Sequence, residues 1–321
     1  MLMRNSPPPH TLIMAMRAAA LLRPASRRGF CATAESRVAA FTEIGVVGAG
    51  QMGVGIAIVA AANAELRVSL YDRDKGQLAK ALGFANSFLQ KSVAKGKLTE
   101  EQGALAMDRF AVTSELGDLA EVDFVVEAAT ENPELKATIF GELCSTVKEG
   151  AILASNTSSI PITRIGAATQ RPESVIGMHF MNPVPVMKLV EVIPSLASSD
   201  ETVATTLALA RAMGKTTAMS KDVPGFIANR LLMPYINEAV IALETGVGTA
   251  DDIDTVMKLG TNVPMGPLTL ADFIGLDTCL AIMETLHSGL GDSKYRAAPL
   301  LRRYVDAGWL GKKSGRGFYD Y

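Results

Sequence analysis

Two side chains in the middle of the chain have the types and the spacing of an acid–base pair. His179 ends an apolar run, and Glu191 stands inside residues 187–193, an apolar run in which an unpaired carboxylate would be costly. Pro183 and Pro185 lie between them, in a turn that folds the second run back toward the first. A carboxylate that accepts a hydrogen bond from an imidazole N–H fixes the tautomer of the ring and raises its basicity. The pair predicts a general base.

Each member of this pair also has a purely structural interpretation. By position alone, His179 is equally well a hydrogen-bonded structural histidine, and Lys188 or a backbone group would satisfy Glu191. His287 stands at the end of a predicted helix, where a surface or capping role is a better interpretation than a catalytic one. Two polar segments, residues 155–159 with Ser158 and residues 222–230 with Asn229, supply neutral donors for a carbonyl or alkoxide oxygen, although such residues often cap helices or form turns.

A glycine-rich turn near the start of the chain predicts a dinucleotide site. It reads Gly48-Ala49-Gly50-Gln51-Met52-Gly53, follows an apolar run and precedes a helical one. The first glycine permits a tight turn, the second lets the backbone approach a pyrophosphate, and the third allows close packing of helix on strand. Asp72 ends the next strand, where a carboxylate binds a ribose hydroxyl and repels a 2′-phosphate, which favours NAD over NADP. Arg73 softens that preference, and a solvated turn residue is the alternative for Asp72.

The elements that must position these residues alternate between strand and helix. Strand-like runs cover residues 44–47, 67–71, 124–126 and 152–154, and helical runs cover residues 54–62, 75–95 and 133–147. Such alternation predicts a parallel sheet covered by helices on both faces. After about residue 195 helical patterns dominate, over residues 201–213, 224–244, 250–259 and 268–286. The expected fold class is α/β, a Rossmann-type doubly wound sheet followed by an all-α domain.

We expect three parts: a leader (residues 1–40), an NAD-binding domain (41–222) and a helical substrate and dimerisation domain (223–321). Leader arginines stand among small and apolar residues without an acid before Glu35, the composition of a mitochondrial transit peptide. It predicts a location in the mitochondrial matrix; an inconsequential extension is the alternative.

Composition excludes several other classes of protein. The net charge of −2 gives no global electrostatic case for nucleic acid, and no run is long and apolar enough to predict a membrane span. The three cysteines lie far apart, with neither metal-ligand spacing nor a disulfide pattern, so no metal site is expected.

Six segments in order together resemble the 3-hydroxyacyl-CoA dehydrogenase family, most closely its short-chain, single-function members such as 3-hydroxybutyryl-CoA dehydrogenases. The match runs from about residue 43 to the C-terminus. The segments are residues 48–53, 126–132, 154–159, 178–185, 222–230 and 311–319.

The resemblance implies a set of site residues and a homodimer formed through the helical domain. It implies that Ser158, His179 and Asn229 surround the reacting carbon, with Glu191 paired to His179. The implied NAD contacts are Gly48, Gly50, Gln51, Met52, Gly53, Asp72, Glu131, Lys136, Ser158, Asn182 and Lys313. The implied CoA contacts are Ser87, Lys95 or Lys97, and Ser158.

The activity that the resemblance implies is reversible, NAD-dependent oxidation of a 3-hydroxyacyl-CoA to the 3-ketoacyl-CoA in fatty acid beta-oxidation. A beta-hydroxyacid dehydrogenase acting on a free acid is one alternative, but such enzymes rely on a lysine in the helical domain. A non-enzymatic, crystallin-like NAD-binding protein is another, which the full set of polar residues disfavours. The sequence leaves the acyl chain length open.

Overall fold

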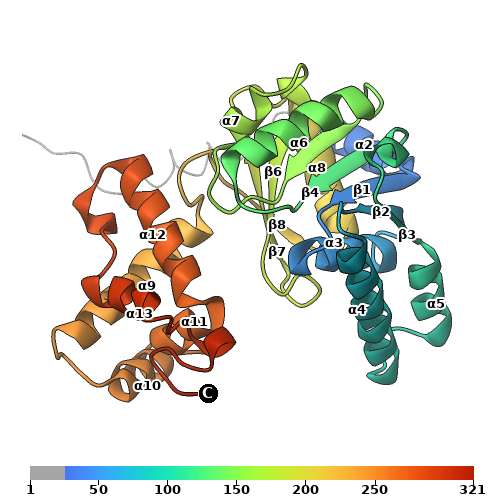
Figure 1. Ribbon diagram of the computed structural model, residues 1–321. Helices are drawn as coiled ribbons and strands as arrows, with labels where there is room; N and C mark the ends of the chain where they lie inside the picture. The colour runs from blue at the N-terminus through green and yellow to red at the C-terminus, as the bar shows by residue number, and fades with distance from the viewer. Residues whose placement is uncertain (1–25) are drawn as a thin grey trace, which may run out of the picture.

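The computed structural model describes residues 26–321, with side chains from residue 33 onward. Residues 1–25, which hold most of the predicted leader, lie outside the described residues. Figure 1 shows two bodies, a sheet with helices on both faces and a smaller all-helical body formed by the C-terminal part of the chain.

The first body is built on one eight-stranded sheet in the order β3-β2-β1-β4-β5-β6-β7-β8. Neighbouring strands are parallel except β6 and β7, which form an antiparallel hairpin. The strands are β1 (Glu43–Val47), β2 (Arg67–Tyr71), β3 (Phe110–Thr113), β4 (Phe124–Glu127), β5 (Ile152–Ser155), β6 (Val175–Phe180), β7 (Leu189–Pro194) and β8 (Thr216–Met219). Strands β1 to β6 have the order of a Rossmann fold, so the predicted fold class is confirmed.

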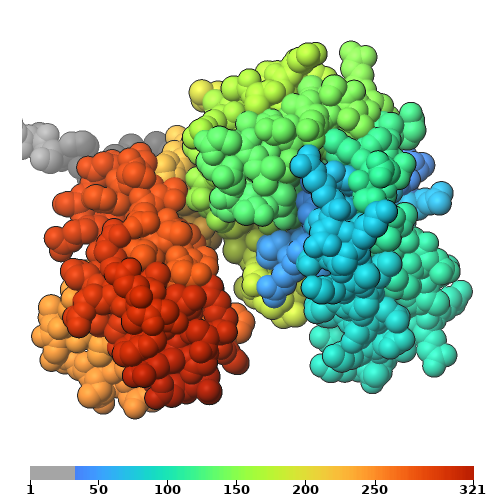
Figure 2. Space-filling view, in the orientation of Figure 1, coloured from blue at the N-terminus to red at the C-terminus, as the bar shows by residue number. Residues whose placement is uncertain are grey.

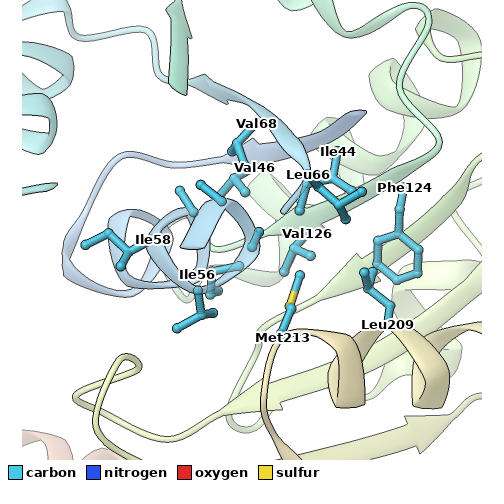
Figure 3. Close-up of a cluster of buried hydrophobic side chains, with 14 of the residues drawn as sticks. Ile44, Val46, Ile56, Ile58, Leu66, Val68, Phe124, Val126, Leu209 and Met213 are labelled. Atoms are coloured by element: carbon cyan, nitrogen blue, oxygen red, sulfur yellow. The ribbon is translucent and has the colours of Figure 1, made fainter. Parts of the chain in front are cut away.

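Two hydrophobic cores lie on opposite faces of this sheet. One face packs against α3, α4, α5 and α8, and Figure 3 shows part of that cluster, including Ile56 and Ile58 of α3 and Val46 and Val126 of the sheet. The other face packs against α6 through Phe140 and Leu143, and against α7 through Ile162 and Ile165. The helices are α3 (Gln51–Ala62), α4 (Lys75–Ala94), α5 (Glu100–Asp108), α6 (Pro133–Thr146), α7 (Ile162–Gly166) and α8 (Asp200–Ala212). The doubly wound arrangement follows from these two cores.

The second body has its own hydrophobic core, whose buried residues come mostly from α9, α11 and α12, and α10 packs against it through Ala250 and Ile253. The helices are α9 (Ala228–Glu244), α10 (Ala250–Gly260), α11 (Pro267–Ile274), α12 (Leu276–Leu290) and α13 (Pro299–Asp306). The single helix expected over residues 268–286 is two helices, because Gly275 has a φ of 103° that no right-handed helix accommodates. In the part of the chain that the structure describes, no helix combines the length and apolar character needed to cross a membrane.

Part of the segment expected as a leader is folded onto the sheet domain. Residues 26–39 form helix α2 (Ser26–Ala39), which packs against α8. Ala34 and Val38 are buried there, and Arg37 pairs with Glu201 of α8 and donates to the carbonyl of Gly150. This helix therefore belongs to the packed structure of the sheet domain.

Candidate active site

The β6–β7 hairpin brings His179 and Glu191 together. The two residues stand directly opposite each other in the antiparallel register, where cross-strand side chains lie closest. His179 Nδ1 lies 2.8 Å from Glu191 Oε2. The histidine is 7% exposed and the glutamate 1%, so solvent does not compete for this bond. With Nδ1 bonded to the carboxylate, Nε2 is the ring nitrogen that remains for a substrate.

The second carboxylate oxygen of Glu191 is hydrogen-bonded to the first turn of the helical domain. Its Oε1 accepts hydrogen bonds from the backbone N–H groups of Ile227 and Ala228, each at 3.0 Å, at the start of α9. Burial would raise the pKa of Glu191, but the bond from His179 and these backbone donors outweigh burial and hold the pKa below its ordinary value. Glu191 is therefore held as a carboxylate.

A tight turn before α9 sets the position of these donors. Gly225 has a φ of 76° and Phe226 a φ of 50°, an uncommon conformation for a bulky residue. The buried Phe226 ring lies against the His179 ring, with centroids 5.7 Å apart. Phe226 was not among the predicted site residues, since an aromatic residue in a turn carries no signal that it will pack on a histidine. Asn229 follows, and its Nδ2 donates to the carbonyl of Ser158 at 3.3 Å.

Glu131 holds the loop that carries Ser158. Its Oε1 accepts hydrogen bonds from the backbone N–H groups of Ser158 and Ser159 at 2.9 and 3.0 Å. The hydroxyls of Thr157, Ser158 and Ser159 donate to the same oxygen at 2.6 to 3.1 Å. Burial would raise the pKa of Glu131, but these donors and Lys136 lower it. The loop after β5 is thereby fixed to the loop after β4.

A buried ion pair lies beneath this loop. Lys136 is 1% exposed, and its Nζ lies 2.6 Å from Glu127 Oε1 and 3.6 Å from Glu131 Oε2. Glu127 also accepts from the Ser155 hydroxyl at 2.7 Å. Glu127 was not among the predicted site residues, although a glutamate ending the buried β4 strand was a signal for a partnered carboxylate.

The glycine turn fits a dinucleotide pyrophosphate. Gly48 has a φ of 99°, and a Cβ at Gly53 would lie 1.7 Å from the carbonyl oxygen of Gly48, so neither position accepts a side chain. Around Gly50 no atom lies within 4 Å of where a Cβ would stand, which leaves space for a phosphate. Gly50 is the N-cap of α3 and makes no side-chain cap bond, so the free N–H groups of the helix face that space.

Two neighbouring cavities border this turn. One is lined by Gly48, Gly50 and Asp72, and Asp72 Oδ2 accepts from the N–H of Ala49 at 2.8 Å. The other lies between the two bodies of the molecule. Ala128 and Ala129 line both cavities, so the two form one path across the ends of the strands.

The second cavity, here called the catalytic cleft, contains most of the predicted site. Figure 2 shows the hollow between the sheet domain and the helical domain. The cleft is lined by the predicted residues Gln51, Met52, Glu131, Ser158, His179, Asn182 and Asn229. Its far wall is apolar and comes from the helical domain, through Leu232, Met233, Leu270, Phe273, Ile274 and Ile282.

Ser87, Lys95 and Lys313 lie away from both the glycine turn and the cleft lining. Lys95 lines a groove between α3 and α4, here called the lysine groove, together with Lys91 and Lys97. Ser87 is half-buried on α4. Lys313 pairs with Asp277 at 2.6 Å within the helical domain. Among residues 33–321 no cluster of His, Cys, Asp and Glu side chains forms a metal site.

Comparisons with known proteins agree with this geometry. The family profile described as "3-hydroxyacyl-CoA dehydrogenase, NAD binding domain" matches residues 43–223, and that described as "3-hydroxyacyl-CoA dehydrogenase, C-terminal domain" matches residues 225–321. A probable 3-hydroxybutyryl-CoA dehydrogenase of Bacillus subtilis is 56% identical over 87% of this chain and 97% of its own length. The 3-hydroxybutyryl-CoA dehydrogenase of Bradyrhizobium diazoefficiens is 53% identical over 88% and 96%. The crystal structure of (S)-3-hydroxybutyryl-CoA dehydrogenase PaaH1 from Ralstonia eutropha superposes with a TM-score of 0.85, at 47% identity over 88% of this chain and 99% of that one.

These relatives overturn one prediction from the sequence. The arginine-rich leader predicted a transit peptide and a location in the mitochondrial matrix. The relatives with more than half of their residues identical are bacterial proteins, from cells that contain no mitochondria. The predicted matrix location is therefore wrong, and the relatives give no support to a transit peptide.

The family matches cover both bodies of the molecule. The first names the cofactor as NAD, and its range includes the glycine turn, Asp72, His179 and Glu191. The second covers the helical body that supplies Asn229 and the apolar wall of the cleft. The chain is therefore an NAD-dependent oxidoreductase that belongs to the 3-hydroxyacyl-CoA dehydrogenase family.

Proposed function

We propose that this protein interconverts short-chain 3-hydroxyacyl-CoA and 3-ketoacyl-CoA thioesters in beta-oxidation, with 3-hydroxybutyryl-CoA as the type substrate. The observation that carries the proposal is the bond of 2.8 Å between His179 and Glu191 at the edge of a cleft with an apolar far wall. An acyl chain fits an apolar wall, and a secondary alcohol needs a base. Relatives named as 3-hydroxybutyryl-CoA dehydrogenases support the same substrate.

His179 acts as the general base through Nε2, which takes the proton of the substrate 3-hydroxyl. Glu191 accepts the hydrogen bond from Nδ1–H and stabilises the imidazolium that forms, while remaining ionised itself. The backbone donors at the start of α9 hold the carboxylate in place, so forming the imidazolium requires little reorganisation of the site. In the reverse direction the imidazolium returns the proton.

Ser158 and Asn229 hold the oxygen of the substrate as its charge changes. Both line the cleft beside His179, and the bond from Asn229 to the Ser158 carbonyl ties them to each other across the two bodies. The second N–H of the Asn229 amide donates to the developing alkoxide or carbonyl, and the Ser158 hydroxyl does so by turning from Glu131, which keeps four other donors. Neither group adds a charge of its own. Glu131 fixes the loop on which Ser158 stands.

When bound, NAD would supply the acceptor for the hydride that leaves C3 of the substrate. The glycine turn and the start of α3 would hold its pyrophosphate, and Asp72 would hold the adenosine ribose. Gln51, Met52, Glu131 and Asn182 line the cleft where the nicotinamide end belongs. Lys136 contributes to this site through its ion pair with Glu131.

The CoA moiety occupies the lysine groove. The groove combines the charges of Lys91, Lys95 and Lys97 with apolar contacts from Phe88 and Val186. Lysines bind phosphate groups as point charges, and the apolar residues suit the pantetheine arm.

An NADH absorbance assay with acetoacetyl-CoA and a series of longer 3-ketoacyl-CoA thioesters tests the function. Turnover that is fastest with the four-carbon substrate is expected, and no NADH oxidation with any thioester would contradict the proposal.

Replacing Asp72 with asparagine is expected to weaken the preference for NADH over NADPH. Asparagine keeps an oxygen for the N–H of Ala49 but removes the charge that repels a 2′-phosphate. The ratio of kcat/KM for NADH to that for NADPH should fall about tenfold, the effect of roughly 1.4 kcal/mol. Asp74→Asn, at the neighbouring N-cap of α4, is the matched control. An unchanged ratio in Asp72→Asn would exclude the role of Asp72.

A homodimer formed through the helical domain is also proposed. Val256 and Leu259 lie one turn apart on α10 and are 65% and 75% exposed, an apolar surface of the kind that marks an interface. The double substitution Val256→Asp with Leu259→Asp is expected to shift the protein to a monomer in analytical ultracentrifugation. Leu196→Asp, a 92% exposed leucine of the sheet domain, should leave the mass unchanged. A wild-type protein that sediments as a monomer would refute the dimer.

A further inference from the structure

Lys215 is a buried lysine that the proposed chemistry does not use. It directly precedes β8 and is 8% exposed. Its Nζ donates to the carbonyl oxygens of Val184 at 2.5 Å and Met187 at 2.9 Å. Within residues 33–321 it takes part in no ion pair with a carboxylate, and burial lowers the pKa of Lys215. Burying an ammonium group costs free energy. We therefore looked for a role that uses both hydrogen bonds of Lys215.

The backbone around Lys215 directs its side chain to this position. Gly214 has a φ of 76°, and a Cβ there would lie 3.1 Å from the Asn63 amide, so the chain turns tightly between α8 and β8. The Asn63 amide in turn donates to the carbonyl of Met213 at 3.0 Å. The turn is thus fixed to the end of α3, and the side chain of Lys215 extends toward the β6–β7 loop.

The segment that Lys215 holds, residues 181–188, separates two cavities. Asn182 and Met187 line the catalytic cleft, whereas Pro185 and Val186 line the lysine groove. Val184 is buried between them and packs on α3, where a Cβ at Gly55 would lie 2.8 Å from the Val184 Cβ. The segment is therefore a shared wall, pressed on α3 from one side and tied to β8 by Lys215 from the other.

We propose that Lys215 is a positioning residue for the CoA thioester, because its two hydrogen bonds fix the wall shared by the catalytic cleft and the lysine groove. The proposal rests on the acyl-CoA function proposed above. A thioester with its acyl group in the cleft and its nucleotide in the groove must pass along this wall. The spacing between the two ends of the substrate is then set by the wall, and Lys215 touches neither end.

The test compares a full and a truncated substrate in Lys215→Met, which keeps the length of the side chain and removes its charge and donors. Acetoacetyl-CoA occupies both cavities, whereas the acetoacetyl thioester of N-acetylcysteamine lacks the nucleotide and needs only the cleft. The ratio of kcat/KM for the CoA thioester to that for the truncated thioester should fall about tenfold, since hydrogen bonds from a charged donor are lost. Calorimetric titration with acetoacetyl-CoA in the absence of NADH should show a similar rise in Kd.

Three further measurements separate this role from a general loss of structure. Lys188→Met, an exposed lysine at the end of the same segment, should leave the ratio and the Kd unchanged. Lys215→Arg, which keeps a charged donor, should recover part of the ratio. If Lys215→Met does not fold, Lys215→Gln serves instead, with a fall in the ratio of about threefold. Equal loss for both substrates, or no loss, overturns the proposal for Lys215. A wild-type protein that turns over neither thioester overturns the proposed function instead.

Discussion

Replacing His179 with glutamine is expected to reduce kcat with acetoacetyl-CoA by about 10²- to 10⁴-fold, the usual contribution of a positioned general acid or base. Glutamine retains a polar group of similar reach at the edge of the cleft, but it cannot exchange a proton near neutral pH. The reduction of acetoacetyl-CoA needs a proton on the forming hydroxyl, and the imidazolium of His179 is the group that we propose as its source. The measurement is steady-state NADH oxidation at saturating substrate.

The same variant should keep its affinity for the cofactor. The proposed pyrophosphate site lies in the glycine turn around Gly48 and Gly50, on a different strand and helix from His179. We therefore expect the Kd for NADH, measured by fluorescence, to stay within about twofold of the wild-type value, well under 1.4 kcal/mol. His287→Gln, an exposed histidine in the last turn of α12, is the matched control and should retain full activity. If His179→Gln kept wild-type turnover, the base would have to be another residue.

The pairing of His179 with Glu191 was predictable because it depends on local rules. An apolar strand, a turn with two prolines and a second apolar strand form a hairpin, and in a hairpin the facing residues are fixed by the length of the loop. The glycine turn was predictable for a similar reason, because each glycine answers a steric need within a few residues of itself. Both predictions concern residues that are close in sequence or belong to one strand–turn–helix unit.

Other features depend on contacts between distant segments, and the sequence did not indicate them. Strand β8 is short and its residues are half-exposed or exposed, so it lacks the apolar pattern of a core strand; it forms because β7 offers a free edge. Helix α2 was expected as part of a leader, because its arginines do not reveal that Ala34 and Val38 pack on α8. Lys215 carries no local signal, since its partners are carbonyl groups 31 and 28 residues away.

Replacing Glu191 with glutamine is expected to reduce kcat nearly as much as removing His179, although glutamine has the same shape as glutamate. The carboxylate uses one oxygen for the N–H groups of Ile227 and Ala228 and the other for His179. The amide must direct its oxygen at the two backbone donors, because an N–H facing an N–H is costly. Its NH₂ group then faces His179 Nδ1, which becomes an acceptor. The ring proton moves to Nε2, and the ring no longer serves as a base.

This reversal of the tautomer predicts a fall in kcat of about 10²- to 10⁴-fold in Glu191→Gln, with the Kd for NADH retained. Glu191→Asp, which keeps the charge, should lose less of its kcat than the amide variant.

The stability of the fold provides a second measurement, because the folded pKa of Glu191 lies below the reference value of 4.5. The carboxylate therefore stabilises the fold fully above that pH, and its contribution is lost as the pH falls through the folded pKa. The difference in free energy of unfolding between wild type and Glu191→Gln should accordingly be constant near neutral pH and shrink below about pH 4.5. A variant with normal turnover would show that Glu191 serves only to attach α9 to the sheet domain, whereas a large loss of turnover with unchanged folding assigns it to orienting the base.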